Sequence, residues 1–362
     1  MDVRASEAGA CNRDAAGDAV LRANGAGMVS AAATTEVPMT QATRAVLTIA
    51  TGKWIYLNMA IALARSFLWW HRDSDIEFFI ATDIADPLPP DMERIRVLRF
   101  QPGELGKGFS MKLKLDQLAP GAQTLFIDAD CLCVGRLEPV FERFAGHQVS
   151  VVGGNISEGE WFGDIATTRS HFGIAEMPKF NGGVYYIEPG DKATQVYARA
   201  RELERRYDEL GLVRLRNCPN EELLVSISMA LEGCAGIEDD GSIHGELFAS
   251  PLLHEVDVLR GVARLSNPPP TDPAHRPGYP VREIAPVIVH FLGDFTTKWQ
   301  YRSEERVLRL VSLRRIPALA ARAWVNLTYR YPAMTLDRVR NALRPLYRRL
   351  FGARRVRWEE RF

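Results

Sequence analysis

Apolar residues fall largely into short unbroken runs, and segments with helical spacing separate them. Runs of this kind predict strands buried on both faces, as in parallel sheets. We expect strands at residues 46–50, 76–82, 95–100, 125–127, 149–152, 184–187 and 287–289. Helices are expected at residues 56–70, 111–118, 139–145, 192–210 and from 221 onward. The alternation of strands and helices predicts an α/β fold with a mainly parallel sheet and flanking helices.

Some stretches lack this pattern. Residues 1–42 are rich in Ala, Gly, Ser and Thr, and they carry too little apolar surface to offset the entropy of ordering, so we expect disorder there. Residues 153–179 show little periodicity and predict a long loop, and the Pro-rich residues 267–280 predict another. The chain is expected to divide into a disordered segment at 1–42, a globular domain at 43–301 and a helical tail at 302–362.

Two aspartates, Asp128 and Asp130, follow the apolar run at residues 125–127. Extended backbone would place both carboxylates on one side of the strand, where their repulsion calls for a cation such as a divalent metal with oxygen ligands. The alternative is a strand end with two solvated acids. Ligands of parallel sheets bind beyond the carboxyl ends of the strands, and Thr51 and Asp83 are also expected near that edge.

Local signals mark further boundaries. Ser110 is expected to cap the N-terminus of the helix at 111–118, and Asn220 that of the helix after it. The consecutive glycines Gly182 and Gly183 suit a tight turn or a close approach of the backbone to a ligand.

Composition fits a soluble globular protein, with 46% hydrophobic and 25% charged residues. The five cysteines show no Cys-x-x-Cys spacing, and Cys131 and Cys133 would share one face of a strand. This suits buried thiols in a reducing cytoplasm better than a disulfide or a zinc site. No early basic cluster is followed by an apolar run, so we expect no secretion signal. The most apolar segment, residues 57–70, is too short to span a bilayer.

Charge is distributed unevenly although the chain is neutral overall. Residues 302–362 contain 16 Arg, no Lys and 5 acidic residues, a net charge of +11. Such a tail could bind an anionic membrane surface, bind nucleic acid, or form a solvated helical extension. Apolar and aromatic residues alternate with the arginines and favour a membrane surface: Leu346, Tyr347, Leu350, Phe351 and Trp358. Nucleic acid is disfavoured because the rest of the chain is acidic and holds no such motif. The expected location is the cytoplasm, with peripheral attachment to the inner face of the membrane.

Four motifs in order carry a family resemblance. They are Ser110-Met111-Lys112-Leu113, Phe126-Ile127-Asp128-Ala129-Asp130, Phe180-Asn181-Gly182-Gly183-Val184, and Val289-His290-Phe291-Leu292-Gly293 followed by Lys298-Trp299. Over residues 46–301 the sequence resembles the family 8 glycosyltransferases, which include glycogenin. It departs from that family at Asn220-Glu221-Glu222, where Asp-Gln-Asp is usual, and at Thr297-Lys298-Trp299, where Lys-Pro-Trp is usual.

The resemblance implies a GT-A fold and transfer of a hexose from a nucleotide-diphosphate sugar, UDP-glucose or UDP-galactose, with retention at the anomeric carbon. The acceptor would be a hydroxyl group of a glycan, a lipid-linked glycan or another molecule. Asp128, Asp130 and His290 would hold Mn²⁺ or Mg²⁺, and the histidine favours Mn²⁺. The metal would neutralise the charge that develops on the diphosphate leaving group, and Lys298 would add a positive charge there.

The resemblance also implies roles for individual residues. Glu221 would face the anomeric carbon, or else serve only as an acid in the first turn of its helix. Asn181 would donate a hydrogen bond to the sugar, or else occupy a turn. Lys112 would contact the donor, or else form a helix-surface pair with Asp116. The full set expected to bind the donor is Thr51, Tyr56, Asp83, Lys112, Gly182, Gly293 and Lys298.

Two other classes of protein are alternatives. A sugar-1-phosphate nucleotidyltransferase would carry a Gly-rich, Arg-containing loop after the first strand, and Thr51-Gly52-Lys53-Trp54 does not match it. A non-catalytic nucleotide-sugar-binding or scaffold protein attached to a membrane by its tail stays open because of the altered Asn220-Glu221-Glu222 segment.

Overall fold

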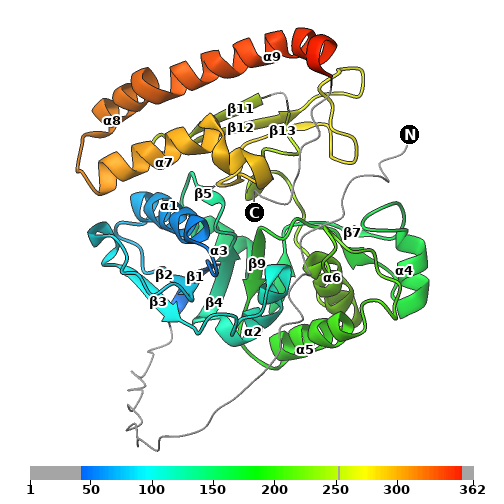
Figure 1. Ribbon diagram of the computed structural model, residues 1–362. Coiled ribbons are helices and arrows are strands. Elements are labelled where there is room, and N and C mark those ends of the chain that lie inside the picture. Colours follow the sequence, from blue (N-terminus) through cyan, green and yellow to red (C-terminus); the bar gives the residue numbers. More distant parts are fainter. Residues whose placement is uncertain (1–41, 252, 353–362) are drawn as a thin grey trace, which may run out of the picture.

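A computed structural model describes residues 42–251 and 253–352. Its centre is a six-stranded sheet in the order β3-β2-β1-β4-β9-β6 (Figure 1). The strands are β3 (Ile95–Arg99), β2 (Glu77–Thr82), β1 (Ala42–Ile49), β4 (Gly121–Ile127), β9 (Val184–Ile187) and β6 (Val149–Val151). The first four are parallel, whereas β9 is antiparallel to both of its neighbours. The expected α/β fold with a mainly parallel sheet is confirmed.

Both faces of this sheet are buried, which explains the unbroken apolar runs. In β1, Val46 packs into one core with helix α1 (Trp54–Trp70), while Leu47 packs into another with α5 (Asp191–Arg205) and α6 (Glu221–Leu231). Successive side chains of a strand point to opposite faces, so a central strand needs apolar residues at every position. Helix α3 (Glu138–Phe144) lies on the same side as α1.

Smaller sheets accompany the large one. One has the order β10-β14-β5 and consists of His244–Glu246, Ile288–His290 and Cys131–Cys133. A second is antiparallel and consists of β11 (Leu253–Asp257), β12 (Val262–Asn267) and β13 (Arg282–Ile284), and β7 (Asn155–Ile156) pairs with β8 (Met177–Pro178). The sequence indicated β5 and β14 but missed the others, which are short or alternate with polar residues.

Three expectations about local structure are wrong. Ser110 does not cap a helix, because it lies inside the 3-10 helix η2 (Gly108–Lys114) and its hydroxyl bonds to Glu204, with only the short α2 (Leu115–Leu118) following. Residues 153–179 are not one loop. They contain β7, β8 and helix α4 (Ile165–Phe172), which is capped by the Asp164 side chain. Helix α5 ends at residue 205 rather than 210.

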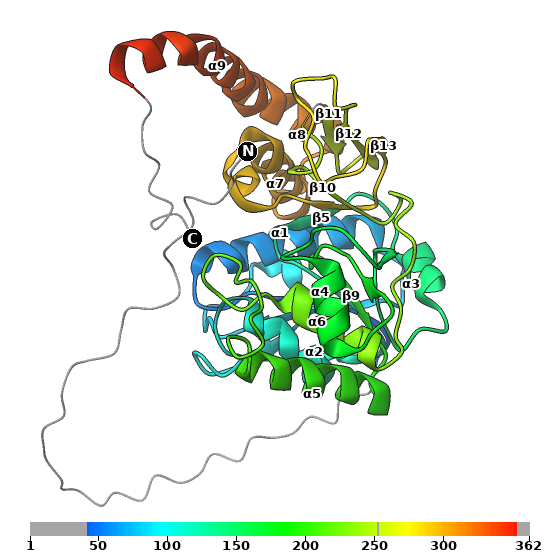
Figure 2. The same ribbon diagram turned by 90° about the vertical axis from the view of Figure 1, so that its right-hand side faces the viewer.

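The C-terminal part is helical, as expected, through α7 (Trp299–Ser312), α8 (Ala318–Val325), the π-helical segment η4 (Asn326–Arg330) and α9 (Tyr331–Phe351). Figures 1 and 2 show these helices on the side of the molecule away from α5 and α6. The expected division at residue 302 falls within the first turn of α7, where Tyr301 is buried against Phe291. The expectations for residues 1–41, including Cys11, and for residues 353–362, including Trp358, lie outside the described residues.

A buried ion cluster holds the C-terminal helices together. The Arg322 guanidinium of α8 contacts both carboxylate oxygens of Glu304 in α7, at 2.6 and 2.7 Å, and Asp257 Oδ1 at the end of β11, at 2.6 Å. Glu304 is only 1% exposed and also accepts a hydrogen bond from Val258 N. If Arg322 were lost, the buried Glu304 would keep only the more distant Arg330, whose Nη1 lies 3.8 Å from Glu304 Oε1.

We therefore expect Arg322→Met to lower the free energy of unfolding by about 3 kcal/mol, because it leaves Glu304 buried without its partner. Denaturant titration followed by circular dichroism would measure the change. Arg322→Met combined with Glu304→Gln should recover part of the loss, and Arg338→Met, on exposed α9, should change little. Equal stability of the Arg322 variant and the wild type would show that the cluster contributes nothing.

Candidate functional site

The Asp128–Asp130 pair lies at the end of β4, in the middle of the large sheet. Cys131 N donates to Asp128 O at 3.0 Å, so the two aspartates occupy a turn that joins β4 to β5. The expectation that the backbone is extended at Asp128 and Asp130 is therefore wrong. The turn brings them to one side, and both side chains are partly exposed, 23% for Asp128 and 22% for Asp130.

Strand register brings distant residues to this turn. In the small sheet His290 of β14 pairs with Cys131 of β5, and Glu246 of β10 pairs with His290. Phe291 N also donates to Asp130 O at 3.0 Å. This pairing carries His290 to Asp130, with Nε2 of the ring 3.0 Å from Asp130 Oδ1.

The two glycines fit because the site is crowded. Strand β9 runs antiparallel to β4, and Asp128 N donates to Gly183 O at 2.9 Å. A Cβ atom on Gly183 would lie 2.7 Å from His290 Nδ1 and 2.8 Å from His244 Nε2. One on Gly182 would lie 3.0 Å from carboxylate oxygens of Glu221 and Glu222. A side chain at Gly183 would displace His290 itself, so neighbouring side chains require glycine at this position. The close approach of the backbone to a ligand stays a prediction.

Lys112 supplies the positive charge nearest to the aspartates. Its Nζ lies 2.8 Å from Asp128 Oδ2, 2.8 Å from Gly182 O and 3.1 Å from Glu221 Oε1. The alternative pairing with Asp116 is wrong, because Asp116 forms a two-point ion pair with Arg201. Lys112 thus joins the end of β4 to the N-terminus of α6.

Helix α6 begins as expected, with the Asn220 side chain accepting a hydrogen bond from Glu222 N at 3.0 Å. This cap fixes the two glutamates of the first turn over the glycine pair. Glu222 Oε1 accepts from Gly182 N at 2.7 Å, and Glu221 is 3% exposed. Glu221 Oε2 has no hydrogen-bond partner within the described part of the chain. Glu221 therefore holds a buried acceptor ready for a further donor or cation.

Asn181 orients the imidazole of His290. Its Nδ2 donates to Glu246 Oε2 at 3.3 Å, which turns Oδ1 toward the backbone N–H of Gly183 and toward His290 Nδ1, both at 3.0 Å. Because an amide oxygen can only accept, His290 must carry a proton on Nδ1. That tautomer turns Nε2 toward Asp130, as in metal sites where a second group fixes the ligand histidine.

The donor atoms fit a divalent cation. One ligand atom each of Asp128, Asp130 and His290 lie within 4.8 Å of one another, and His290 Nε2 is buried without an aligned hydrogen-bond partner among the described residues. A second set, Cys131, His244 and His290, is also this close but entirely buried. Burial, Asp130 and Asp128 raise the pKa of the Cys131 thiol, which opposes thiolate ligation. Two carboxylates and one imidazole with partial solvent access suit Mn²⁺ or Mg²⁺.

Electrostatics point the same way. Burial would lower the pKa of His290, but Asp130 and Asp128 outweigh it and raise the value to about 9. The metal-free ring is therefore protonated on both nitrogens near neutral pH, and a metal bound at Nε2 would replace the proton there. Burial and the nearby Glu221 raise the pKa of Glu222 to about 8. Burial also raises the pKa of Glu246. Carboxyl groups outnumber cations in this part of the site, so an added cation would be stabilised.

The residues expected at the sheet edge are less closely joined to this centre. Asp83 Oδ1 accepts from Gly52 N at 2.7 Å, and the Thr51 hydroxyl contacts Met111 Sδ at 2.9 Å. The Tyr56 hydroxyl is within electrostatic reach of the centre, because burial and then Asp130 raise its pKa, whereas Arg216 lowers it. Tyr56 thus lies near Asp130.

Lys298 and Gly293 lie beyond β14. Gly293 has a φ of +64° and opens the 3-10 helix η3 (Gly293–Thr297), a backbone shape that favours glycine. The Lys298 ammonium rests 4.0 Å from the centre of the Phe295 ring, and in the described chain no hydrogen bond or ion pair joins it to Asp128, Asp130 or His290. The structure therefore places Lys298 apart from the carboxylates.

Several residues of the site were missed by sequence reasoning. Glu246 and His244 belong to the three-residue strand β10, which has too few apolar residues to be noticed. Glu222 was noticed only as part of a motif, although its hydrogen bond to Gly182 makes it part of the site. Arg216 sits with Asn217 at positive φ in a two-residue turn closed by Leu215 and Cys218. The dipeptide Arg216-Asn217 could have indicated a turn from the sequence. The electrostatic effect of Arg216 on Tyr56 depends on the fold, so the sequence could not show it.

No model of a known protein family matches the sequence, and no curated protein matches it either. Among solved structures, the chain is similar to the galactosyltransferase LgtC in complex with donor and acceptor sugar analogues, with 16% identity and a TM-score of 0.43 over 69% of this chain and 87% of that one. It is similar to mouse xyloside xylosyltransferase 1, with 12% identity and a TM-score of 0.38 over 56% and 87% of the two chains. It is also similar to the glycosyltransferase GlyE of Streptococcus pneumoniae TIGR4, with 14% identity and a TM-score of 0.37 over 55% and 46%. The function has to be inferred from the chemistry of the site.

We expect Gly183→Ala to weaken Mn²⁺ binding by roughly tenfold or more, because the added methyl group must displace His290 from Asp130. Calorimetric titration of the protein with Mn²⁺ would measure it. Gly154→Ala is the matched control, since that glycine is exposed and a Cβ there meets nothing within 4 Å. Wild-type Mn²⁺ affinity in Gly183→Ala would remove His290 from the metal site.

Proposed function

We propose that this protein is a metal-dependent glycosyltransferase that moves a hexose from a nucleotide-diphosphate sugar to a hydroxyl acceptor. The observation that carries the proposal is the convergence of Asp128, Asp130 and His290 at the carboxyl end of the central strand, beside Lys112. Ligand sites of open α/β sheets occur at that edge. Loss of a diphosphate leaving group needs positive charge held in place before the bond breaks.

Asp128, Asp130 and His290 would hold the metal, Mn²⁺ in preference to Mg²⁺. When bound, the metal supplies Lewis-acid neutralisation of the diphosphate. The Asn181–His290 contact keeps Nε2 directed at the metal position, and Lys112 offsets the charge of Asp128 and Glu221. These contacts hold the ligand groups in one geometry, so little reorganisation accompanies the reaction.

Glu221 is our candidate for the group that faces the anomeric carbon. It is buried at the first turn of α6, its Oε1 is fixed by Lys112, and its Oε2 lacks a partner. Asn181 and the Gly182–Gly183 backbone would line the sugar position, consistent with transfer that retains the anomeric configuration. Gly293 and Lys298 belong to a segment that would move toward the diphosphate once the donor is bound. Closure of a surface segment over a bound substrate is common in enzymes.

The donor base and ribose would lie at the open edge of the sheet. Thr51 and Asp83 follow β1 and β2, and Asp130 acts electrostatically on the Tyr56 hydroxyl. We propose uridine as the base, with glucose or galactose as the sugar. The acceptor would be a hydroxyl group of a glycan or of a lipid-linked glycan.

The test measures hydrolysis of donor sugars in the absence of acceptor, with Mn²⁺ added. Of the two aspartate substitutions, Asp130→Asn is easier to interpret, because Asp128→Asn also breaks the ion pair with Lys112. Loss of a negatively charged metal ligand should weaken the hold on the metal that neutralises the leaving group and slow hydrolysis by about 100-fold, since loss of such stabilisation costs about 3 kcal/mol in the transition state. His290→Ala should be rescued in part by raised Mn²⁺, whereas Lys298→Ala should be slow at every Mn²⁺ concentration.

The control is Asp73→Asn, which removes an exposed carboxylate that is not assigned to the site. Full activity of Asp130→Asn, or of the wild type in excess chelator, would contradict the metal role. Donor binding by the wild type without any hydrolysis or transfer would instead favour a nucleotide-sugar-binding scaffold protein.

We further propose that α9 attaches the protein to an anionic membrane surface, and that the protein acts at the inner face of the membrane in the cytoplasm. No residue of α9 is buried. Leu336, Val339, Leu343, Leu346 and Leu350 recur every three or four residues and form one apolar face, and arginines flank it. Within the described ranges, no helix is both long and apolar enough to cross a bilayer.

Leu346→Ser with Leu350→Ser should reduce sedimentation with anionic vesicles at least about tenfold, because each leucine loses roughly 1.5 kcal/mol or more of apolar burial. The two side chains are 55% and 65% exposed in the free protein, so folding should not suffer. Val213→Ser with Val281→Ser, 50% exposed each and away from α9, is the control. Unchanged sedimentation of the leucine variant, or self-association through α9 on ultracentrifugation, would oppose membrane attachment.

A further inference from the structure

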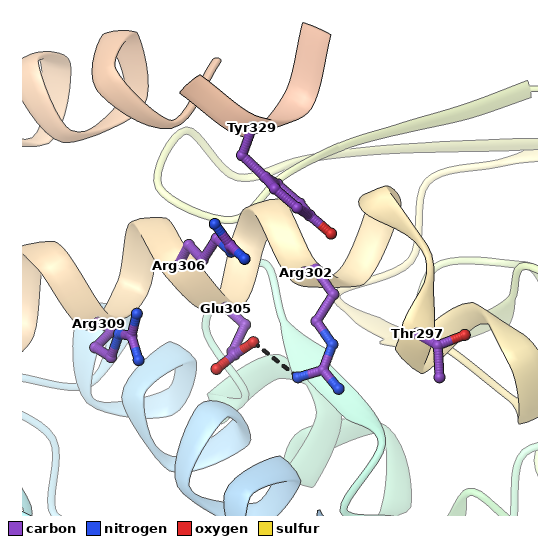
Figure 3. A pocket seen from close by; sticks show the side chains of 6 residues that line it. All are labelled: Thr297, Arg302, Glu305, Arg306, Arg309 and Tyr329. Atoms are coloured by element: carbon purple, nitrogen blue, oxygen red, sulfur yellow. Dashed lines mark hydrogen bonds and ion pairs between the residues drawn. The ribbon is translucent and has the colours of Figure 1, made fainter. Parts of the chain in front are cut away.

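A polar pocket lies on the C-terminal helices, outside the carboxylate site. Figure 3 shows lining side chains on α7, with Tyr329 reaching toward them from the segment above and Thr297 to one side. Its volume is about 290 Å³. Six residues line it: Thr297, Arg302, Glu305, Arg306, Arg309 and Tyr329. A volume of this size is at the lower end for ligand sites and suits a compact polar group better than a whole ligand.

Three arginines face the pocket from one side of α7. Arg302, Arg306 and Arg309 are spaced four and three residues apart, which places them on one face of the helix. Arg302 is paired with Glu305 at 3.1 Å. Arg306 and Arg309 are exposed, and no ion pair to either occurs among the described residues. Like charges at this spacing repel, so the cluster would be stabilised by a bound anion.

Tyr329 fixes one arginine in place. The guanidinium carbon of Arg306 lies 3.8 Å from the centre of the Tyr329 ring, close enough for a cation–π contact (Figure 3). Stacking occupies the face of the guanidinium and leaves its in-plane N–H groups free to donate. Tyr329 belongs to η4, and π-helical turns inside helices are frequent at functional sites.

The charge and geometry select the ligand class. Three arginines against one glutamate leave a net charge of +2 in the pocket. A guanidinium fork pairs with two oxygens at a time, and a phosphate group carries more oxygens than a carboxylate, so one phosphate can be shared among several arginines. The segment η4 continues directly into α9. A phosphate in the pocket would therefore lie close to the N-terminus of this amphipathic helix.

We propose that this pocket binds the phosphate or phosphodiester group of an anionic ligand. The group can come from a lipid headgroup at the membrane or from a soluble phosphate compound. Arg306 and Arg309 donate to its oxygens, Tyr329 holds Arg306, and Glu305 restrains Arg302. The inference does not depend on the proposed transfer reaction, because none of these residues lies in the carboxylate site.

The experiment uses the full chain and two probes. Inorganic phosphate is titrated calorimetrically, and phosphatidylcholine vesicles containing phosphatidylglycerol are tested by flotation. Arg306→Gln with Arg309→Gln should weaken phosphate binding at least about tenfold, because hydrogen bonds to charged groups are lost. Glu305→Gln should strengthen phosphate binding, because it frees Arg302. A gain of binding cannot come from misfolding, so this variant keeps the test decisive.

Arg340→Gln with Arg344→Gln is the matched control, since it removes the same charge from exposed α9 and should leave phosphate binding unchanged. Loss of both probes in the pocket variant supports a lipid headgroup as the ligand. Loss of inorganic phosphate alone supports the pocket with a soluble phosphate compound as ligand. No phosphate binding by the wild type, or equal binding by the wild type, the pocket variant and Glu305→Gln, would overturn the proposal.

Discussion

The crowding of carboxylates at the end of β4 is the constraint on which the site depends. Asp128 and Asp130 share one turn, and Glu221 and Glu222 approach them from α6, across the glycine pair. Repulsion among such groups must be offset, and the chain offers Lys112 and His290. The remaining negative charge favours a divalent cation. Asp128 and Asp130 follow β4, Glu221 and Glu222 belong to α6, and His290 belongs to β14. A cation bound there would therefore face groups from the large sheet, from α6 and from the small sheet.

Asn181 shows how one side chain can serve two ends of the site. The structure makes it the group that sets the tautomer of His290, with Glu246 holding the amide in turn. The family resemblance implies a different role for Asn181, a hydrogen bond to the sugar. Orienting His290 and bonding to the sugar are compatible roles. It also explains why Gly183 must lack a side chain, since the amide oxygen of Asn181, the ring of His290 and that of His244 all meet there.

The two ends of the molecule have opposite electrostatic character. Acidic groups gather around β4, whereas arginines dominate α7 to α9. The buried Glu304–Arg322 pair joins α7 to α8, and the contacts of these two residues with Val258 and Asp257 attach the helices to the chain after β11. An acidic centre concentrates metal cations, and a basic surface concentrates phosphates. A protein with this division can hold a metal at one place and an anionic surface at another without the two fields cancelling.

The sequence by itself determined the elements with strong local signals. The apolar runs at β1, β2, β4 and β9 and the Asn220 cap were recognisable because burial on both faces and helix capping leave local patterns. Only the tertiary structure decided which residues meet. The turn at Asp128–Asp130, the register that sets Glu246 beside His290, and the choice of Asp128 rather than Asp116 as the partner of Lys112 depend on strands and helices distant in the chain. Such pairings follow from long-range packing and strand register, and no local pattern encodes them.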